Sequence, residues 1–194
     1  MRIAENYRST KETQIKVKIN LDGEGESNIK TPAFFLNHML NLFSRHSLFN
    51  LDIEADGDVE VDFHHLTEDI GIVLGETFLK ALGQKEGIKR YGSFYVPMDE
   101  ALAFCAVDIS GRPFIVFDAA FGRDKVGDFD VELVEEFFRA FASSARITLH
   151  LEAIRGQNTH HIIEALFKAF GRALKEAAAV DPREKGIPST KGVL

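Results

Sequence analysis

One seven-residue pattern, (Asp/Asn)-x-His-His-x-x-Glu, occurs twice in this chain and constrains its fold more than any other feature. The first copy, residues 62–68, reads Asp-Phe-His-His-Leu-Thr-Glu, and the second, residues 158–164, reads Asn-Thr-His-His-Ile-Ile-Glu. We call them the first box and the second box. Asp and Asn are favoured helix N-caps, so each histidine pair is expected in the first turn of a helix.

The residue types in the boxes indicate metal binding. At 3.6 residues per turn, two adjacent histidines and a glutamate three positions on share roughly a 100° arc of one helix face. The positive end of the helix dipole disfavours imidazolium there, so neutral rings are expected. One such box is typical of a solvated helix face, but two in register favour ligation. Imidazole and carboxylate together suit Mn, Fe, Co or Zn. The expected ligands are His64, His65, Glu68, His160, His161 and Glu164.

The repeat extends beyond the boxes. A shift of 96 residues, from His64 to His160, also places Leu74 on Phe170 and Gly75 on Gly171. This period is far longer than that of solenoids, so it indicates a duplicated half-domain. We expect halves at 1–92 and 93–194 that together form one compact catalytic domain. The predicted fold class is α+β, with strands plus two helices per half and four helices packed between two small mixed β-sheets.

In each half, the predicted order of elements is strand, strand, helix, strand, helix. Alternating apolar residues predict strands, and apolar residues at helical spacing predict helices. Thr31-Pro32 and Asp130 are read as helix starts. Gly71 and Gly75 lower the helix propensity, so they predict close packing against another element. The expected strands are 13–21, 27–30, 48–55, 59–61, 101–109, 113–120 and 146–153, and the expected helices are 31–46, 62–83, 131–143 and one that starts at the second box.

Composition limits the classes of partner. Hydrophobic residues make up 45% of the 194 residues and charged residues 27%, as in ordinary globular proteins. A net charge of −7 argues against a general nucleic-acid or acidic-membrane surface. The single Cys105 excludes an intrachain disulfide and fits a reducing cytoplasm. No apolar stretch approaches transmembrane length. We expect a cytoplasmic protein without nucleic-acid or membrane partners.

Further ligands are needed, because one or two octahedral metals take more donors than two boxes supply. His38 lies 26 residues before His64, and Glu136 lies 24 before His160, so each stands at a matching place in its half. Two other classes could use such boxes. One is a metal-buffering or shell-forming protein without catalysis. The other is a di-iron carboxylate oxidase, although that class typically pairs Glu-x-x-His motifs on long helices without many strands.

Several segments, in order along nearly the whole chain, resemble the imidazoleglycerol-phosphate dehydratase family of histidine biosynthesis. They are 11–13 (Lys-Glu-Thr), 37–40 with 45–46, the first box through 71, 88–92, 108–113, 156–170 and the tail 188–194. The resemblance implies two Mn²⁺ per active site, with His38, Glu136 and the six box residues in the ligand positions. Two departures stand out: relatives have His at position 136, and they often carry Asp-Gln where this chain has Asn41-Leu42.

The implied activity is a hydro-lyase reaction that converts D-erythro-imidazoleglycerol phosphate to imidazole-acetol phosphate. The ring is expected to bind as imidazolate and to expel hydroxide through a diazafulvene-like intermediate. Glu12 is the expected base. The family also implies a homo-oligomer of twenty-four subunits built from trimers, with active sites at subunit interfaces. The small phosphorylated imidazole substrate is expected to contact Glu12, His46, Arg90, Arg112, Lys168, Ser189, Thr190 and Lys191.

Overall fold

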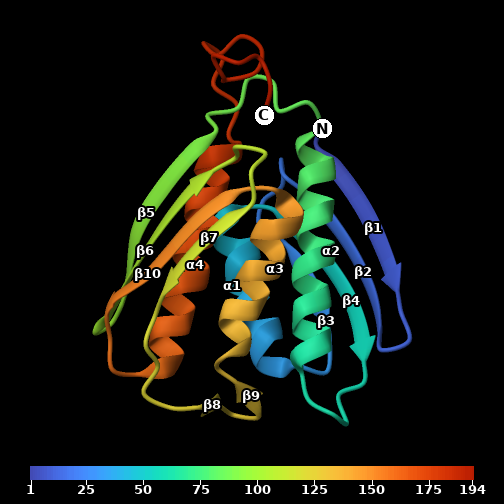
Figure 1. Cartoon of the computed structure of the whole chain (residues 1–194), viewed down its shortest axis with the longest axis vertical. Coiled ribbons are helices and arrows are strands. Elements are labelled where there is room, and N and C mark those ends of the chain that lie inside the picture. The colour runs from blue at the N-terminus through green and yellow to red at the C-terminus, as the bar shows by residue number, and fades with distance from the viewer.

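The computed structural model describes residues 1–194, with four helices between two four-stranded sheets (Figure 1). The first sheet has the order β1-β2-β4-β3, formed by Ile3–Ser9, Thr13–Asn20, Asn50–Gly57 and Ser27–Lys30. The second has the order β5-β6-β10-β7, formed by Tyr91–Met98, Ala101–Asp108, Thr148–Arg155 and Phe114–Asp118. The helices are α1 (Phe34–Ser47), α2 (His64–Leu82), α3 (Leu133–Ala145) and α4 (Thr159–Ala178). Two short strands, β8 (Lys125–Val126) and β9 (Phe129–Asp130), pair below them. The predicted α+β class is confirmed.

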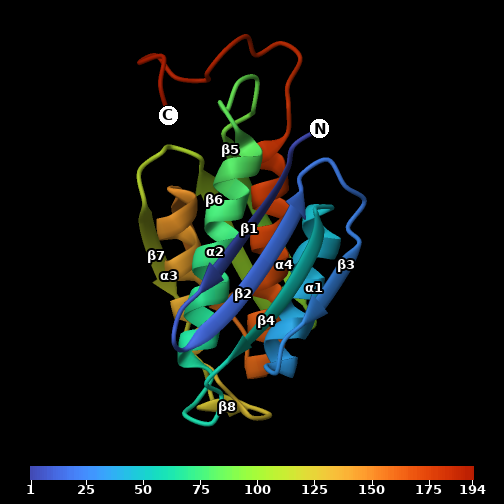
Figure 2. The same cartoon turned by 90° about the vertical axis from the view of Figure 1, so that its right-hand side faces the viewer.

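The two sheets repeat one topology, as the duplication predicts. In each sheet the first three strands are antiparallel, and the fourth, which precedes the half's first helix, is parallel to its neighbour. Figure 2 shows the first sheet face on, with α1 and α2 behind it. Thr13 and Ala101 open the equivalent strands β2 and β6, so residues of β1 to β3 match residues 88 positions later.

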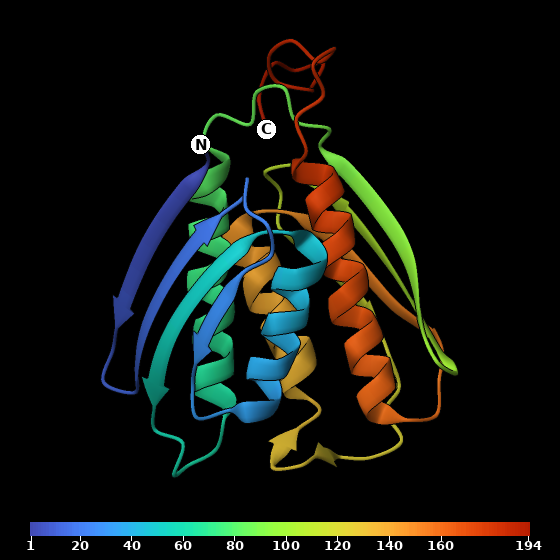
Figure 3. The ribbon, with the colours of Figure 1, turned by 180° about the vertical axis from the view of Figure 1, so that it is seen from behind.

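The helices of one half pack on the helices of the other. Figure 3 shows α1 beside α4, and Figure 1 shows α2 beside α3. Glycines permit this approach: a Cβ on Gly75 of α2 would lie 2.7 Å from the Phe141 carbonyl oxygen of α3. A Cβ on Gly171 of α4 would lie 3.0 Å from the Phe43 carbonyl oxygen of α1. Such contacts with rigid backbone leave no room for a side chain. The predicted close packing of the helix glycines is therefore confirmed.

Several predicted boundaries are wrong. The edge strands β1 and β5 were not expected, because most of their side chains are exposed or half-buried and give no strong apolar pattern. Thr31 does not cap α1; its hydroxyl donates to Asn37 Oδ1, and the helix starts at Phe34. Residues 59–61 form a turn, in which the Val61 N–H donates to the Asp58 carbonyl. Asp130 ends β9 and does not cap α3.

Both box helices have the histidine pair in their first turn, as predicted, although the N-cap of α2 is Phe63 and not Asp62. Asp62 Oδ1 accepts from the His64 N–H at 2.7 Å, and Asn158 Oδ1 accepts from the His160 N–H at 3.0 Å. One apolar cluster of 50 buried residues runs through both halves, so the halves share a core. The division at residues 92 and 93 stays a prediction. Two four-stranded sheets exclude the helical-bundle oxidase. None of the helices has the length and apolarity needed to cross a bilayer.

Candidate metal centre

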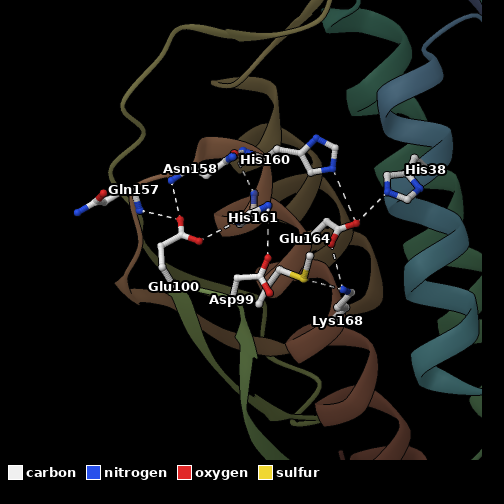
Figure 4. A network of polar contacts seen from close by, with 10 residues as sticks. His38, Asp99, Glu100, Gln157, Asn158, His160, His161, Glu164 and Lys168 are labelled. Carbon is white, nitrogen blue, oxygen red and sulfur yellow. Dashed lines mark hydrogen bonds and ion pairs between the residues drawn. The ribbon is translucent and has the colours of Figure 1, made fainter.

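The second box contributes to a cluster of three metal-ligand types. Ligand atoms of His38, His160 and Glu164 all lie within 4.8 Å of one another. His38 Nε2 is 2.9 Å from Glu164 Oε1, and His160 Nε2 is 3.8 Å from the same oxygen (Figure 4). The packing of α1 on α4 brings His38 to this position. Two imidazole nitrogens and a carboxylate oxygen form a partial site for a first-row divalent metal.

Glu164 is the buried member of this cluster, with 6% of its surface exposed. Burial favours the neutral acid and would raise its pKa. Hydrogen bonds from Lys168 and His38 outweigh burial, so the pKa of Glu164 lies below its ordinary value. Lys168 Nζ is 3.0 Å from Oε2 and also contacts Met98 Sδ at 3.3 Å. The carboxylate is therefore ionised and can accept a cation at Oε1.

His161, the second histidine of this box, faces a different carboxylate. Its Nδ1 is 2.8 Å from Glu100 Oε2, whereas its Nε2 is 3.9 Å from Asp99 Oδ2. The hydrogen bond to Glu100 raises the pKa of His161. The same bond, with backbone N–H groups of Asn158 and Gln157, lowers the pKa of Glu100 to about 2.

The first box lies at the start of α2 and forms no comparable cluster within the chain. The His64 and His65 rings lie 6.1 Å apart, and His65 Nδ1 is 3.0 Å from Asp58 Oδ2. That hydrogen bond raises the pKa of His65, with a smaller contribution from Glu12. At His65 and His161 the hydrogen bonds to carboxylates thus act against the expected bias toward neutral rings.

Glu12 lies near the first box, as its effect on His65 indicates. Its backbone carbonyl accepts from the Asp58 N–H at 3.0 Å. A cavity of about 330 Å³ opens here, lined by residues 10–14 and 56–58. The Glu12 side chain makes no hydrogen bond within the chain, so its carboxylate remains available to a ligand in this cavity.

Glu136 occupies the place in α3 that His38 has in α1. Phe43 and Phe141 make equivalent contacts with Gly171 and Gly75, and they are 98 residues apart. The same offset leads from His38 to Glu136. Because α3 packs on α2, Glu136 lies on the side of the first box, although the structure records no contact between them. At the second box, a residue of the first half's first helix, His38, thus joins His160 and Glu164 of the second half.

The remaining predicted contact residues lie elsewhere. Arg90 Nε is 2.7 Å from Asp108 Oδ1, and its Nη1 donates to the Pro188 carbonyl at 3.0 Å. The bond to Asp108 raises the pKa of Arg90 further. Arg112 Nη2 is 3.9 Å from Asp108 Oδ2. These cations thus gather beside the tail that carries Ser189, Thr190 and Lys191.

The cationic cluster and the boxes lie at opposite ends of the helices. The Arg90 N–H donates to the Ala177 carbonyl near the end of α4, whereas the second box forms its start. The 20 residues of α4 span about 30 Å. His46 lies between the two ends. Burial lowers the pKa of His46, and the positive charges of Lys168 and Arg172 lower it further. One chain thus holds the boxes and the cationic cluster apart.

Asp58 and Glu100 were missed at the level of sequence, although both hold box histidines. Each lies in a turn whose position depends on a neighbouring strand. If β1 and β5 had been recognised as equivalent strands, Glu100 would have been found, because it precedes β6 as Glu12 precedes β2. The structure defines a class of internally duplicated α+β protein, with a histidine–glutamate box at the start of one helix in each half.

Comparison with known proteins identifies the family within this class. The family model of imidazoleglycerol-phosphate dehydratase matches residues 31–174. The dehydratase of Bacillus licheniformis is 60% identical over the full length of both chains. That of Acetivibrio thermocellus is 59% identical over 96% of each chain. The crystal structure of the Staphylococcus aureus enzyme matches with a TM-score of 0.84 at 51% identity, covering 92% of this chain and 99% of that one.

The structure of the Pyrococcus furiosus enzyme, in complex with the compound (S)-C348, matches with a TM-score of 0.84 at 40% identity, over 97% of this chain and all of that one. The chain belongs to the imidazoleglycerol-phosphate dehydratase family. It is therefore a lyase that catalyses a dehydration in histidine biosynthesis. This result favours the enzyme over a metal-buffering or shell-forming protein.

Proposed function

We propose that this chain dehydrates D-erythro-imidazoleglycerol phosphate to imidazole-acetol phosphate in the cytoplasm, with two Mn²⁺ per active site. The observation that supports a metal most directly is the cluster of His38, His160 and Glu164. Its ionised, almost fully buried carboxylate has two imidazole nitrogens beside one oxygen. Borderline nitrogen and hard oxygen donors together fit Mn²⁺.

The proposed ligands come from both boxes and from the helices that pack on them. They are His38, His64, His65, Glu68, Glu136, His160, His161 and Glu164. Manganese, when bound, supplies a Lewis acid and a template for the imidazole ring. The histidines that face Glu100 and Asp58 through Nδ1 keep Nε2 for ligation. Glu136 is proposed because a carboxylate oxygen also binds Mn²⁺.

The dehydration removes a hydroxyl group from the carbon beside the ring and a proton from the next carbon. Loss of hydroxide leaves a diazafulvene-like intermediate, and loss of the proton gives an enol that tautomerises to the ketone. Glu12 is the proposed acceptor of that proton, because its free carboxylate borders the cavity beside the first box. His46 and Lys168 are proposed substrate contacts.

The phosphate is proposed to bind Arg90, Arg112, Ser189, Thr190 and Lys191. Replacement of Arg90 by Ala should raise KM about 10–100-fold, because a hydrogen bond to a charged group contributes about 1.5–3 kcal/mol. Steady-state kinetics would measure it. Arg183→Ala is the matched control, since Arg183 is exposed and pairs only with Asp181. An unchanged KM in the Arg90 variant would remove this residue from the proposed phosphate site.

The proposed assembly is supported by the distance between the two groups of residues. A small substrate cannot contact a metal at the start of α4 and cations about 30 Å away at its end. Neither box has a full ligand set within one chain. We therefore propose active sites shared between copies, in a homo-oligomer of trimers that totals twenty-four subunits. A closed assembly of this kind repeats one interface by symmetry.

A mixing experiment tests the sharing of sites. His160→Ala removes a proposed ligand, and truncation after Gly186 removes the tail. Each variant alone should be nearly inactive. Co-expressed in one assembly, they should recover part of the activity, because some sites then combine an intact box with an intact tail. Purification through two different tags, followed by kinetics, would measure it. Activity no higher than that of the separate variants would contradict shared sites.

A further inference from the structure

The second histidine of each box makes the same contact with a carboxylate, but the acid comes from a different part of each half. His65 Nδ1 is 3.0 Å from Asp58, which follows β4. His161 Nδ1 is 2.8 Å from Glu100, which lies in the turn between β5 and β6. The duplication does not make these two acids equivalent. Their common contact therefore indicates, independently of the duplication, that each of these histidines needs a carboxylate at Nδ1.

Glu100 is held more firmly than an ordinary surface carboxylate. Its Oε1 accepts from the Asn158 N–H at 2.7 Å and from the Gln157 N–H at 3.1 Å, while Oε2 faces His161 (Figure 4). Asn158 in turn caps α4 through the His160 N–H. The acid thus fixes both the ring and the loop that starts the helix. The other ring nitrogen, Nε2, has no hydrogen bond, since Asp99 is 3.9 Å away.

The equivalent acid in the first half is free. Glu12 precedes β2 as Glu100 precedes β6, and the two are 88 residues apart, the offset of the strands. Residues 58–63 link β4 to α2, whereas only 156–158 link β10 to α4. The longer link brings Asp58 to His65, so Glu12 is not needed to hold the His65 ring.

We propose that Glu100 is a positioning residue, which orients His161 through Nδ1 so that Nε2 binds a divalent metal. The inference rests on the proposed function and deepens it: of two equivalent glutamates, Glu100 orients a ligand and Glu12 is left for the reaction. A carboxylate on the far nitrogen of a metal-bound imidazole fixes its tautomer and orientation, and its loss typically lowers metal affinity 10–100-fold.

The test compares Glu100→Gln with the unsubstituted protein in its native assembly. The Mn²⁺ dissociation constant, from the electron paramagnetic resonance signal of free Mn²⁺, should rise about 10–100-fold for one class of site. kcat should return close to the unsubstituted value at saturating Mn²⁺, and Glu100→Asp should recover part of the affinity. Glu86→Gln, at an exposed position near the other end of α2, is the matched control.

The Asn158→Ala variant distinguishes an effect on the His161 ring from an effect on the start of α4. It removes the cap of α4 but leaves the Glu100 carboxylate, so melting temperature should fall with a smaller loss of Mn²⁺ affinity. An equal loss in both variants would show that Glu100 acts through the helix and would overturn the inference. So would an unchanged dissociation constant in Glu100→Gln while the unsubstituted protein binds Mn²⁺. If the unsubstituted protein binds no Mn²⁺, the metal part of the proposed function fails, and the inference fails with it.

Discussion

Removal of bound metal should lower dehydratase activity by about 10³-fold or more, because a Lewis acid contributes several kcal/mol to such a reaction. At the second box, the imidazoles of His38 and His160 lie beside the ionised, buried carboxylate of Glu164. The measurement is product formation after chelation and gel filtration, with metal content determined on the same sample. Added Mn²⁺ should restore the rate.

Two controls test whether the loss of activity is due to loss of the metal. Circular dichroism should show that the chelated protein keeps its helices, because one apolar core of 50 buried residues runs through both halves. Mg²⁺, which prefers oxygen ligands, should restore much less activity than Mn²⁺ at a site rich in imidazole. Full activity in a sample without measurable metal would contradict the proposed chemistry.

Replacement of Glu12 by Gln should lower kcat about 10²–10⁴-fold, the usual contribution of a positioned general base. The amide keeps the size of the side chain but cannot accept the proton. Because the Glu12 side chain makes no hydrogen bond in the chain, neither the melting temperature nor Mn²⁺ affinity should change much. Steady-state kinetics at saturating Mn²⁺ would measure the effect.

The matched control for Glu12 is Glu60→Gln, at an exposed position in the turn before α2. It should leave kcat unchanged. The contrast with Glu100→Gln is informative as well, since that variant should lose metal affinity and recover kcat when Mn²⁺ is saturating. If Glu12→Gln also recovered with excess Mn²⁺, Glu12 would be a metal-positioning residue, and the proton acceptor would lie elsewhere.

The sequence predicts those parts of the fold that have strong periodicity. Buried strands such as β2, with alternating apolar residues, and the box helices were located within a few residues. The edge strands β1 and β5 were missed because Tyr7, Tyr91 and Tyr95 face outward and interrupt the apolar pattern. Exposure at a sheet edge removes the burial signal on which such predictions depend.

The structure brings together three of the predicted ligands, His38, His160 and Glu164, whereas their binding of a metal stays a prediction. The duplicated boxes identify His160 and Glu164, and the matching place of His38 suggests a third ligand. Spacing alone cannot tell which box His38 serves, because α1 could pack on either box helix. The contacts of Asp58 and Glu100 depend on turns between strands, and their geometry follows from tertiary packing. The role of Asp58 is therefore visible only in three dimensions, and Glu100 could be found from the sequence only if β5 were recognised as the counterpart of β1.

The most direct test of the central claim is anomalous diffraction from crystals grown with Mn²⁺, recorded above the manganese absorption edge. We expect two anomalous peaks per active site, one of them beside His38, His160 and Glu164, with imidazoles of the first box of a neighbouring copy completing the ligand set. Ordered boxes that face away from each other with no anomalous peak at either would contradict the account.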